Sequence, residues 1–117
     1  MTFRRLEEMT GGWIVGNFTP TCLRTEACEV ACKHYEAGAH EGAHVHRIAT
    51  EITLIASGRA RMVGREFVAG DIIILDPGDA TDFLAIEPTT TVVVKMPSVM
   101  GDKYPVTLDR QLVGAGA

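Results

Sequence analysis

The sequence predicts an all-β protein, built as an antiparallel sandwich or barrel. After residue 10 no segment shows convincing helical periodicity, and about nine short apolar or alternating runs are separated by turns rich in glycine, proline and aspartate. At 117 residues, with 46% hydrophobic and 22% charged residues, the chain is long enough to bury a core of its own. We therefore expect a single domain over residues 1–117, with no internal repeat.

The elements follow in order from the N-terminus. Residues 1–10 predict a short helix or an irregular lead-in, and Trp13–Val15 a short strand between glycines. Residues 25–35 alternate in the way typical of a half-buried strand, and we expect Cys28, Cys32 and His34 on the inward face. Further strands are predicted at residues 44–48, 51–56, 59–63, 67–68, 72–75, 83–86 and 90–96.

Three features of the sequence predict which residues are buried. The run at residues 72–75 is apolar throughout, which predicts a strand buried on both faces. Lys95 interrupts a valine run and is interpreted first as an edge or snorkelling lysine, with a substrate-binding cation at the mouth of a pocket as the alternative. Trp13 and Phe18 are expected in the core or in an apolar patch against a second subunit.

Composition narrows the classes of partner and compartment. The net charge is −4 and no cluster of lysine and arginine occurs, which argues against a nucleic-acid partner. No apolar run approaches the ~20 residues of a membrane span, and the N-terminus lacks the apolar core of a secretory signal. An odd number of cysteines, three, argues against a disulfide framework. We expect a cytoplasmic protein.

The chemistry of the sequence is concentrated between residues 38 and 58. His44 and His46 are two residues apart, so on an extended strand they point to the same face. Glu51 begins the next predicted strand and can bring a carboxylate to that face. Two imidazoles and a carboxylate are suitable ligands for a divalent transition metal such as iron, manganese, nickel, cobalt or zinc.

The complete pattern is Gly38-x5-His44-x-His46-x4-Glu51-x6-Gly58. It resembles the first motif of the cupin superfamily at every fixed position. The resemblance implies a double-stranded β-helix, a jelly-roll barrel of six to ten antiparallel strands, in which His44, His46 and Glu51 are metal ligands. It also implies a barrel core at about residues 26–97, preceded by N-terminal strands at 11–25 and followed by a loose tail at 98–117.

The second cupin motif is only partly present. Gly70 and Gly78 have the family's separation, but Thr81 stands where the family has a histidine ligand. A threonine hydroxyl is a poor ligand for a transition metal. Three protein ligands completed by water are our first interpretation; His40, from the preceding loop, is the second candidate for a fourth ligand, and Asp82 the third.

The resemblance leaves the reaction open, because cupins include oxygenases, isomerases, lyases, storage proteins and sensors. One hypothesis is an enzyme that acts on a small polar metabolite through the metal, with His34, His40 or Asp82 as general base. The alternative is a non-catalytic module that binds a metal or small ligand; a third is a structural protein with remnant histidines. The aromatic content of 6% favours small polar ligands over large aromatic ones. The resemblance also favours a homodimer.

Overall fold

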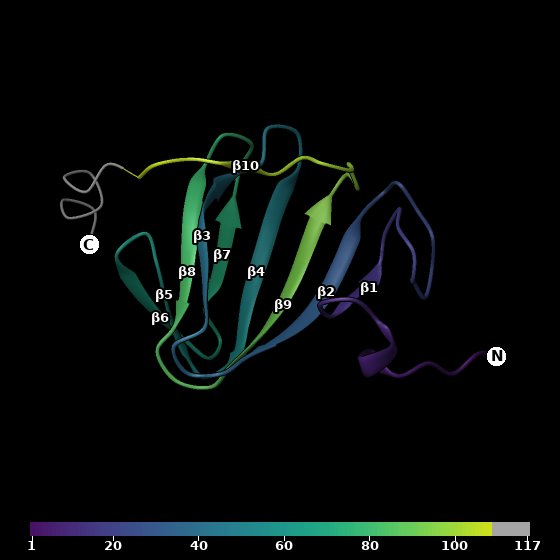
Figure 1. The fold of residues 1–117 in the computed structure, drawn as a ribbon, viewed down its shortest axis with the longest axis horizontal. Helices are drawn as coiled ribbons and strands as arrows, with labels where there is room; N and C mark the ends of the chain where they lie inside the picture. The colour runs from purple at the N-terminus through teal and green to yellow at the C-terminus, as the bar shows by residue number, and fades with distance from the viewer. Residues whose placement is uncertain (109–117) are drawn as a thin grey trace.

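The computed structural model describes residues 1–108, which form two five-stranded antiparallel sheets (Figure 1). The first sheet has the order β1-β2-β9-β4-β7, with bounds Trp13–Val15, Glu29–Tyr35, Thr89–Met96, Thr50–Ser57 and Ile72–Leu75. The second has the order β10-β3-β8-β5-β6, with bounds Tyr104–Pro105, His40–Val45, Ala80–Ala85, Arg59–Met62 and Arg65–Val68. A short 3-10 helix, η1 (Leu6–Glu8), precedes them, and no helix within residues 1–108 has the length and apolar character to cross a membrane. The predicted all-β antiparallel fold is confirmed.

The core lies where the two sheets pack face to face. Ile55 of β4 and Ala60 of β5 are fully buried, and Phe83 of β8 is 6% exposed. The ring of Phe83 stacks on Tyr35 of β2 at a centroid distance of 4.5 Å. These contacts come from both sheets and hold the two together. Tyr35 and Phe83 also line a cavity whose walls come from both sheets.

The apolar run of β7 predicts a strand buried on both faces, and this prediction is wrong. It is the edge strand of the first sheet, and Ile72 and Ile74 are 62% and 61% exposed on the outer face. Its other face does pack inward, where Leu75 is 8% exposed. An apolar run without alternation does not tell a central strand from an edge strand, because that depends on which strand becomes its neighbour.

The homodimer that the family resemblance favours stays a prediction.

The segment after Pro97, expected to be a loose tail, is packed against the barrel. Ser98 and Asp102 are 7% and 4% exposed, and β10 pairs with β3 through Tyr104 and Val45. In Figure 1 this segment crosses one end of the sandwich, close to the ends of β3 and β4. Residues 109–117 of the predicted tail lie outside the described residues. The strap formed by residues 98–105 therefore adds a strand that the sequence did not predict.

Two glycines of the first motif differ in what they require. Gly58 has a φ of +91°, and a Cβ there would lie 2.2 Å from the carbonyl oxygen of Pro88. Gly38 has a φ of +87°, but a Cβ there would meet nothing within 4 Å. Only Gly58 is held both by its left-handed backbone conformation and by a close approach of another backbone segment.

Replacing Gly58 by alanine is therefore expected to lower the free energy of unfolding by about 3 kcal/mol, since strain and a backbone clash add. Gly38→Ala, with strain alone, is the matched control and is expected to cost about 1 kcal/mol. Urea denaturation of both variants measures the difference. Equal losses in the two variants would show that the contact with Pro88 contributes nothing.

Candidate metal centre

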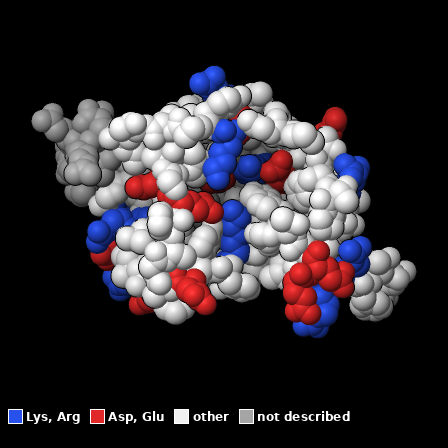
Figure 2. All heavy atoms as spheres, in the orientation of Figure 1, with Lys and Arg blue, Asp and Glu red and all other residues white. Residues whose placement is uncertain are grey.

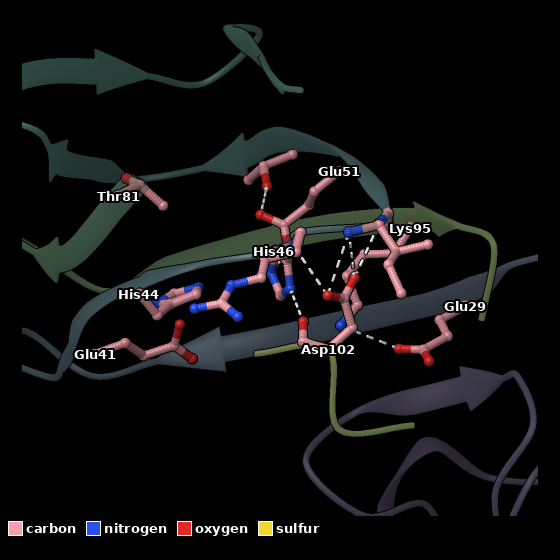
Figure 3. A network of polar contacts seen from close by, with 12 residues as sticks. Glu29, Glu41, His44, His46, Glu51, Thr81, Lys95 and Asp102 are labelled. Atoms are coloured by element: carbon pink, nitrogen blue, oxygen red, sulfur yellow. Dashed lines mark hydrogen bonds and ion pairs between the residues drawn. The ribbon is translucent and has the colours of Figure 1, made fainter. Parts of the chain in front are cut away.

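His44, His46 and Glu51 all border the cavity whose walls come from both sheets. His44 lies in β3, His46 follows that strand directly, and Glu51 lies in β4. His44 and His46 are 7% and 5% exposed. All three side chains line one cavity of about 360 Å³, and Figure 3 shows His46 between His44 and Glu51. The three residues of the sequence motif thus line the same cavity from two segments that belong to different sheets.

Each imidazole is oriented by a backbone carbonyl group. Nδ1 of His44 lies 2.9 Å from the carbonyl oxygen of Gly42, and Nδ1 of His46 contacts the carbonyl oxygen of Asp102. Because a carbonyl oxygen only accepts hydrogen bonds, each Nδ1 must carry the hydrogen. In the neutral form of each ring, Nε2 then keeps the lone pair that a metal ligand needs, an arrangement common among metal-binding histidines.

The Nε2 atom of His46 and the carboxylate of Glu51 would repel each other if the imidazole were neutral. Nε2 of His46 is buried without a hydrogen-bond partner among the described residues, and it lies 3.4 Å from Oε1 of Glu51. The carboxylate raises the pKa of His46 despite burial. Burial by itself would raise the pKa of Glu51, but His46 and Lys95 hold it below its ordinary value. Two lone pairs that face each other require a proton or a cation between them.

These donors fit a divalent transition metal in chemistry, and less well in distance. Among residues 1–108, no three histidine, cysteine, aspartate or glutamate side chains are close enough together to hold a metal ion. The Nε2 atom of His46, which has no hydrogen-bond partner among the described residues, nevertheless forms with the His44 imidazole and the Glu51 carboxylate the donor set that such metals prefer. His44, His46 and Glu51 would have to draw closer to one another to bind an ion.

Asp102 fixes the turn between the two candidate histidines and β4. Its carboxylate, 4% exposed, accepts hydrogen bonds from the backbone N–H groups of Arg47 at 2.8 Å, Ile48 at 3.1 Å and Ala49 at 2.9 Å. Burial by itself would raise the pKa of Asp102, but the hydrogen bonds from these N–H groups outweigh burial and hold the pKa below its ordinary value. Asp102 thus holds both the ring of His46, by its carbonyl group, and the chain that follows, by its side chain.

A bulge in β3 decides which of its side chains enter the cavity. The pairing of β3 with β8 shifts between Glu41 and His44, so these two residues face the same side although they are three apart. Glu41 lines the cavity, whereas His40 is exposed and outside the lining. His40, the second candidate for a fourth ligand and a candidate base, is therefore not in a position to act as either.

Glu41 is a cavity carboxylate that sequence reasoning missed. Its Oε1 accepts a hydrogen bond from the hydroxyl group of Tyr35 at 3.0 Å and lies 3.4 Å from Nζ of Lys33. Burial would raise the pKa of Glu41, but Lys33 and Tyr35 lower it to below the ordinary value. Burial and the neighbouring Glu41 raise the pKa of Tyr35 strongly, so its phenol stays protonated. The glycine beside Glu41 in the strand was the one signal of a bulge.

The inward face of β2 is the opposite of the one we predict from the sequence. His34 is exposed, and its Nδ1 lies 2.8 Å from Oγ1 of Thr90. The cavity is instead lined by Glu29, Lys33 and Tyr35. Alternation separates the two faces of a strand but does not say which is inner, and here the charged face is the inner one. His34 is thus excluded as a base for chemistry in the cavity.

Thr81 and Asp82 both line the cavity, in different roles. Thr81 pairs with His44 across β8 and β3 and is 3% exposed. Its hydroxyl group donates to the carbonyl oxygen of Asp82 at 2.8 Å. Oδ1 of Asp82 accepts the backbone N–H of Val63 at 2.8 Å, which stabilises a residue with a φ of 51°. The Asp82 carboxylate therefore serves the neighbouring turn.

Solved structures identify the fold. An uncharacterized conserved protein with a double-stranded beta-helix domain from Klebsiella pneumoniae matches with a TM-score of 0.62 and 27% identity, over 66% of this chain and 69% of that one. A sugar phosphate isomerase from the cupin superfamily, from Silicibacter pomeroyi, matches with a TM-score of 0.56 and 24% identity, over 60% of this chain and 50% of that one. The chain has the cupin fold. KdgF from a Halomonas species shares this cupin fold, with a TM-score of 0.57 and 20% identity over 62% and 72% of the two chains.

Similarity to solved structures shows the cupin fold of this chain but does not indicate its activity. No protein-family model matches the sequence, and no curated protein matches it. The Klebsiella cupin-fold protein is itself uncharacterized, and identities below 25% show the fold alone. Enzymes occur among the proteins with this cupin fold, as the isomerase shows. The chemistry of this chain has to be argued from its own cavity.

Proposed function

We propose that this cupin binds one divalent transition metal (iron, manganese, nickel or zinc) on His44, His46 and Glu51. We further propose that it is an enzyme acting on a small polar metabolite in the cytoplasm. The observation that supports this most directly is the buried Nε2 of His46, which has no hydrogen-bond partner among the described residues and faces the Glu51 carboxylate at 3.4 Å. A cation between these two atoms would remove the repulsion between them.

The orientation of the two imidazoles supports the same proposal. Both Nδ1 atoms are engaged by backbone carbonyl groups, so both rings present Nε2 as the remaining donor. Thr81, in the position of the family's further histidine ligand, is buried beside His44. Three protein ligands with the remaining positions open to water or substrate are the arrangement we propose.

When bound, such a metal would supply a Lewis acid that polarises a substrate oxygen. Glu41 would then act as the proton acceptor, because it is ionised and lines the same cavity. Tyr35, kept protonated, would hold the Glu41 carboxylate in place by its hydrogen bond of 3.0 Å. Proton transfer next to a polarised oxygen is chemistry of an isomerase or a lyase, which we favour over an oxygenase on the evidence of Glu41.

The metal content of the purified protein tests the proposal. Protein prepared without a tag or chelator is expected to contain about one metal ion per chain by mass spectrometry, and a His44→Ala/His46→Ala variant none. The metal-free protein would be titrated in parallel with Fe(II), Mn(II), Ni(II) and Zn(II). Failure to bind any of the four would refute the metal site and with it the proposed enzyme.

A further inference from the structure

Two of the three lysines that line the cavity are largely buried, and lysine is rarely found buried unless it is paired. Lys33 comes from β2 and Lys95 from β9, and their side chains are only 19% and 14% exposed. Strand β9 is central in its sheet, so Lys95 is not the edge lysine that the sequence predicts. Figure 2 shows acidic and basic side chains gathered near the middle of one face of the molecule.

Each lysine is held by one carboxylate and by a shared aromatic ring. Nζ of Lys95 lies 3.2 Å from Glu29, and Nζ of Lys33 lies 3.4 Å from Glu41. Both ammonium groups contact the Trp13 ring, at 5.0 and 4.9 Å from its centroid. An ammonium group has three N–H donors, and one carboxylate satisfies only some of them. The remaining donors are available to a ligand in the cavity.

The pairing of the strands places Lys95 next to the proposed metal ligands. Along the inner face of the first sheet, Glu29 of β2 pairs with Lys95 of β9, and Lys95 pairs in turn with Glu51 of β4. Directly opposed residues have Cβ atoms about 5 Å apart. A small ligand whose carboxylate is bound by Lys95 can therefore place a neighbouring oxygen atom of its own toward Glu51 and His46.

The charge of the cavity favours a ligand with a single negative charge. The charged side chains that line it are three lysines and four carboxylates, namely Lys33, Lys95, Lys103, Glu29, Glu41, Glu51 and Asp82. With neutral imidazoles the lining carries one negative charge, and a divalent cation turns this into one positive charge. One ligand carboxylate then restores neutrality, which a cavity partly shielded from solvent favours.

We propose that the cavity binds a small 2-hydroxy or 2-keto carboxylic acid, with its carboxylate on Lys95 and its neighbouring oxygen toward Glu51 and His46. Lys33, which also contacts the Trp13 ring, adds a second positive charge to the cavity. The carboxylate position rests on the lysines alone, and the position of the second oxygen rests on the proposed metal function. A volume of about 360 Å³ suits a ligand of this size.

Calorimetric titration of the nickel-loaded and the metal-free protein with lactate, pyruvate, lactamide and inorganic phosphate tests this inference. Lactate or pyruvate is expected to bind the loaded protein at least about tenfold more tightly than the neutral lactamide, because one charge-assisted contact is lost with the amide. Equal binding of lactamide, tighter binding of phosphate, or no binding of either acid would overturn the proposal.

The decisive variant is Lys95→Gln/Glu29→Gln, which removes both charges of the pair and leaves an amide to accept the Ser98 hydroxyl group, now 2.8 Å from Glu29. It is expected to weaken lactate binding by about tenfold or more, and Lys33→Gln by less. Arg65→Gln removes one positive charge from an exposed site outside the cavity and is the control. An unchanged affinity in the double variant would refute the role of Lys95.

The two proposals fail in different ways. If nickel does not bind but the metal-free protein still prefers lactate to lactamide in a manner that depends on Lys95, only the metal site is refuted. If nickel binds and the preference is absent, only the carboxylic-acid ligand is refuted.

Discussion

Replacing Asp102 by alanine is expected to lower the free energy of unfolding by about 3 kcal/mol, a decrease in Tm of about 10–15 °C for a domain of this size. The substitution leaves the three backbone N–H groups of residues 47–49 without the carboxylate that accepts them. The turn between His46 and Glu51 should then loosen, and metal affinity should fall by about 10–100-fold, as is typical when groups behind a ligand are removed. Thermal unfolding of the metal-free protein and metal titration measure the two effects separately.

Asp71→Ala is the matched control for Asp102. The carboxylate of Asp71 also accepts a backbone N–H, that of Val68 at 2.8 Å, but in an exposed turn whose residues do not line the cavity. Its loss is expected to cost at most about 1 kcal/mol and to leave metal affinity unchanged. Asp102→Asn retains one acceptor oxygen and should fall between the two. A metal affinity unaffected by Asp102→Ala would show that the strap stabilises the fold without positioning His46.

Changing Glu51 and Glu41 to glutamine, one at a time, is expected to separate metal binding from catalysis. Glu51→Gln removes the negative charge that faces His46 and should weaken metal binding by about 100-fold. Glu41→Gln keeps the three proposed ligands and should leave metal affinity unchanged, while turnover falls by about 100-fold or more through loss of the proton acceptor. Metal titration, together with assays on a panel of small hydroxy and keto acids, measures both effects.

Glu66→Gln is the control for these two variants, since the carboxylate of Glu66 is exposed and pairs with Arg59 and Arg61 on the surface. It should change neither quantity. Metal loss on Glu41→Gln would make Glu41 a ligand and contradict its assignment as the base. Metal binding without turnover of any acid in the panel, in the unaltered protein, would favour the non-catalytic binding module.

Local patterns in the sequence were sufficient for the fold class and for the three candidate ligands. Strand alternation and turn residues depend on nearby positions only, so the positions of most strands could be predicted, including Ile72–Leu75 at its exact bounds. The strand predicted at residues 44–48 is found at His40–Val45, so strand alternation applies to His44 and not to His46, which follows the strand. The spacing from His46 to Glu51 fits a turn before the next strand.

What surrounds these ligands was decided by contacts between distant segments. A bulge in β3 turned Glu41 inward and His40 outward, and the pairing of β2 with β9 made the charged face of β2 the inner one. Asp102 reaches His46 across more than fifty residues of chain, and Lys95 meets Glu29 across two paired strands. The sequence by itself determined the all-β fold, because strand alternation and turn residues are short-range signals, while the metal role of His44, His46 and Glu51 stays a prediction from the motif. Only the tertiary structure decided which carboxylates and lysines accompany these three residues, because that depends on strand register and on which sheet face becomes enclosed.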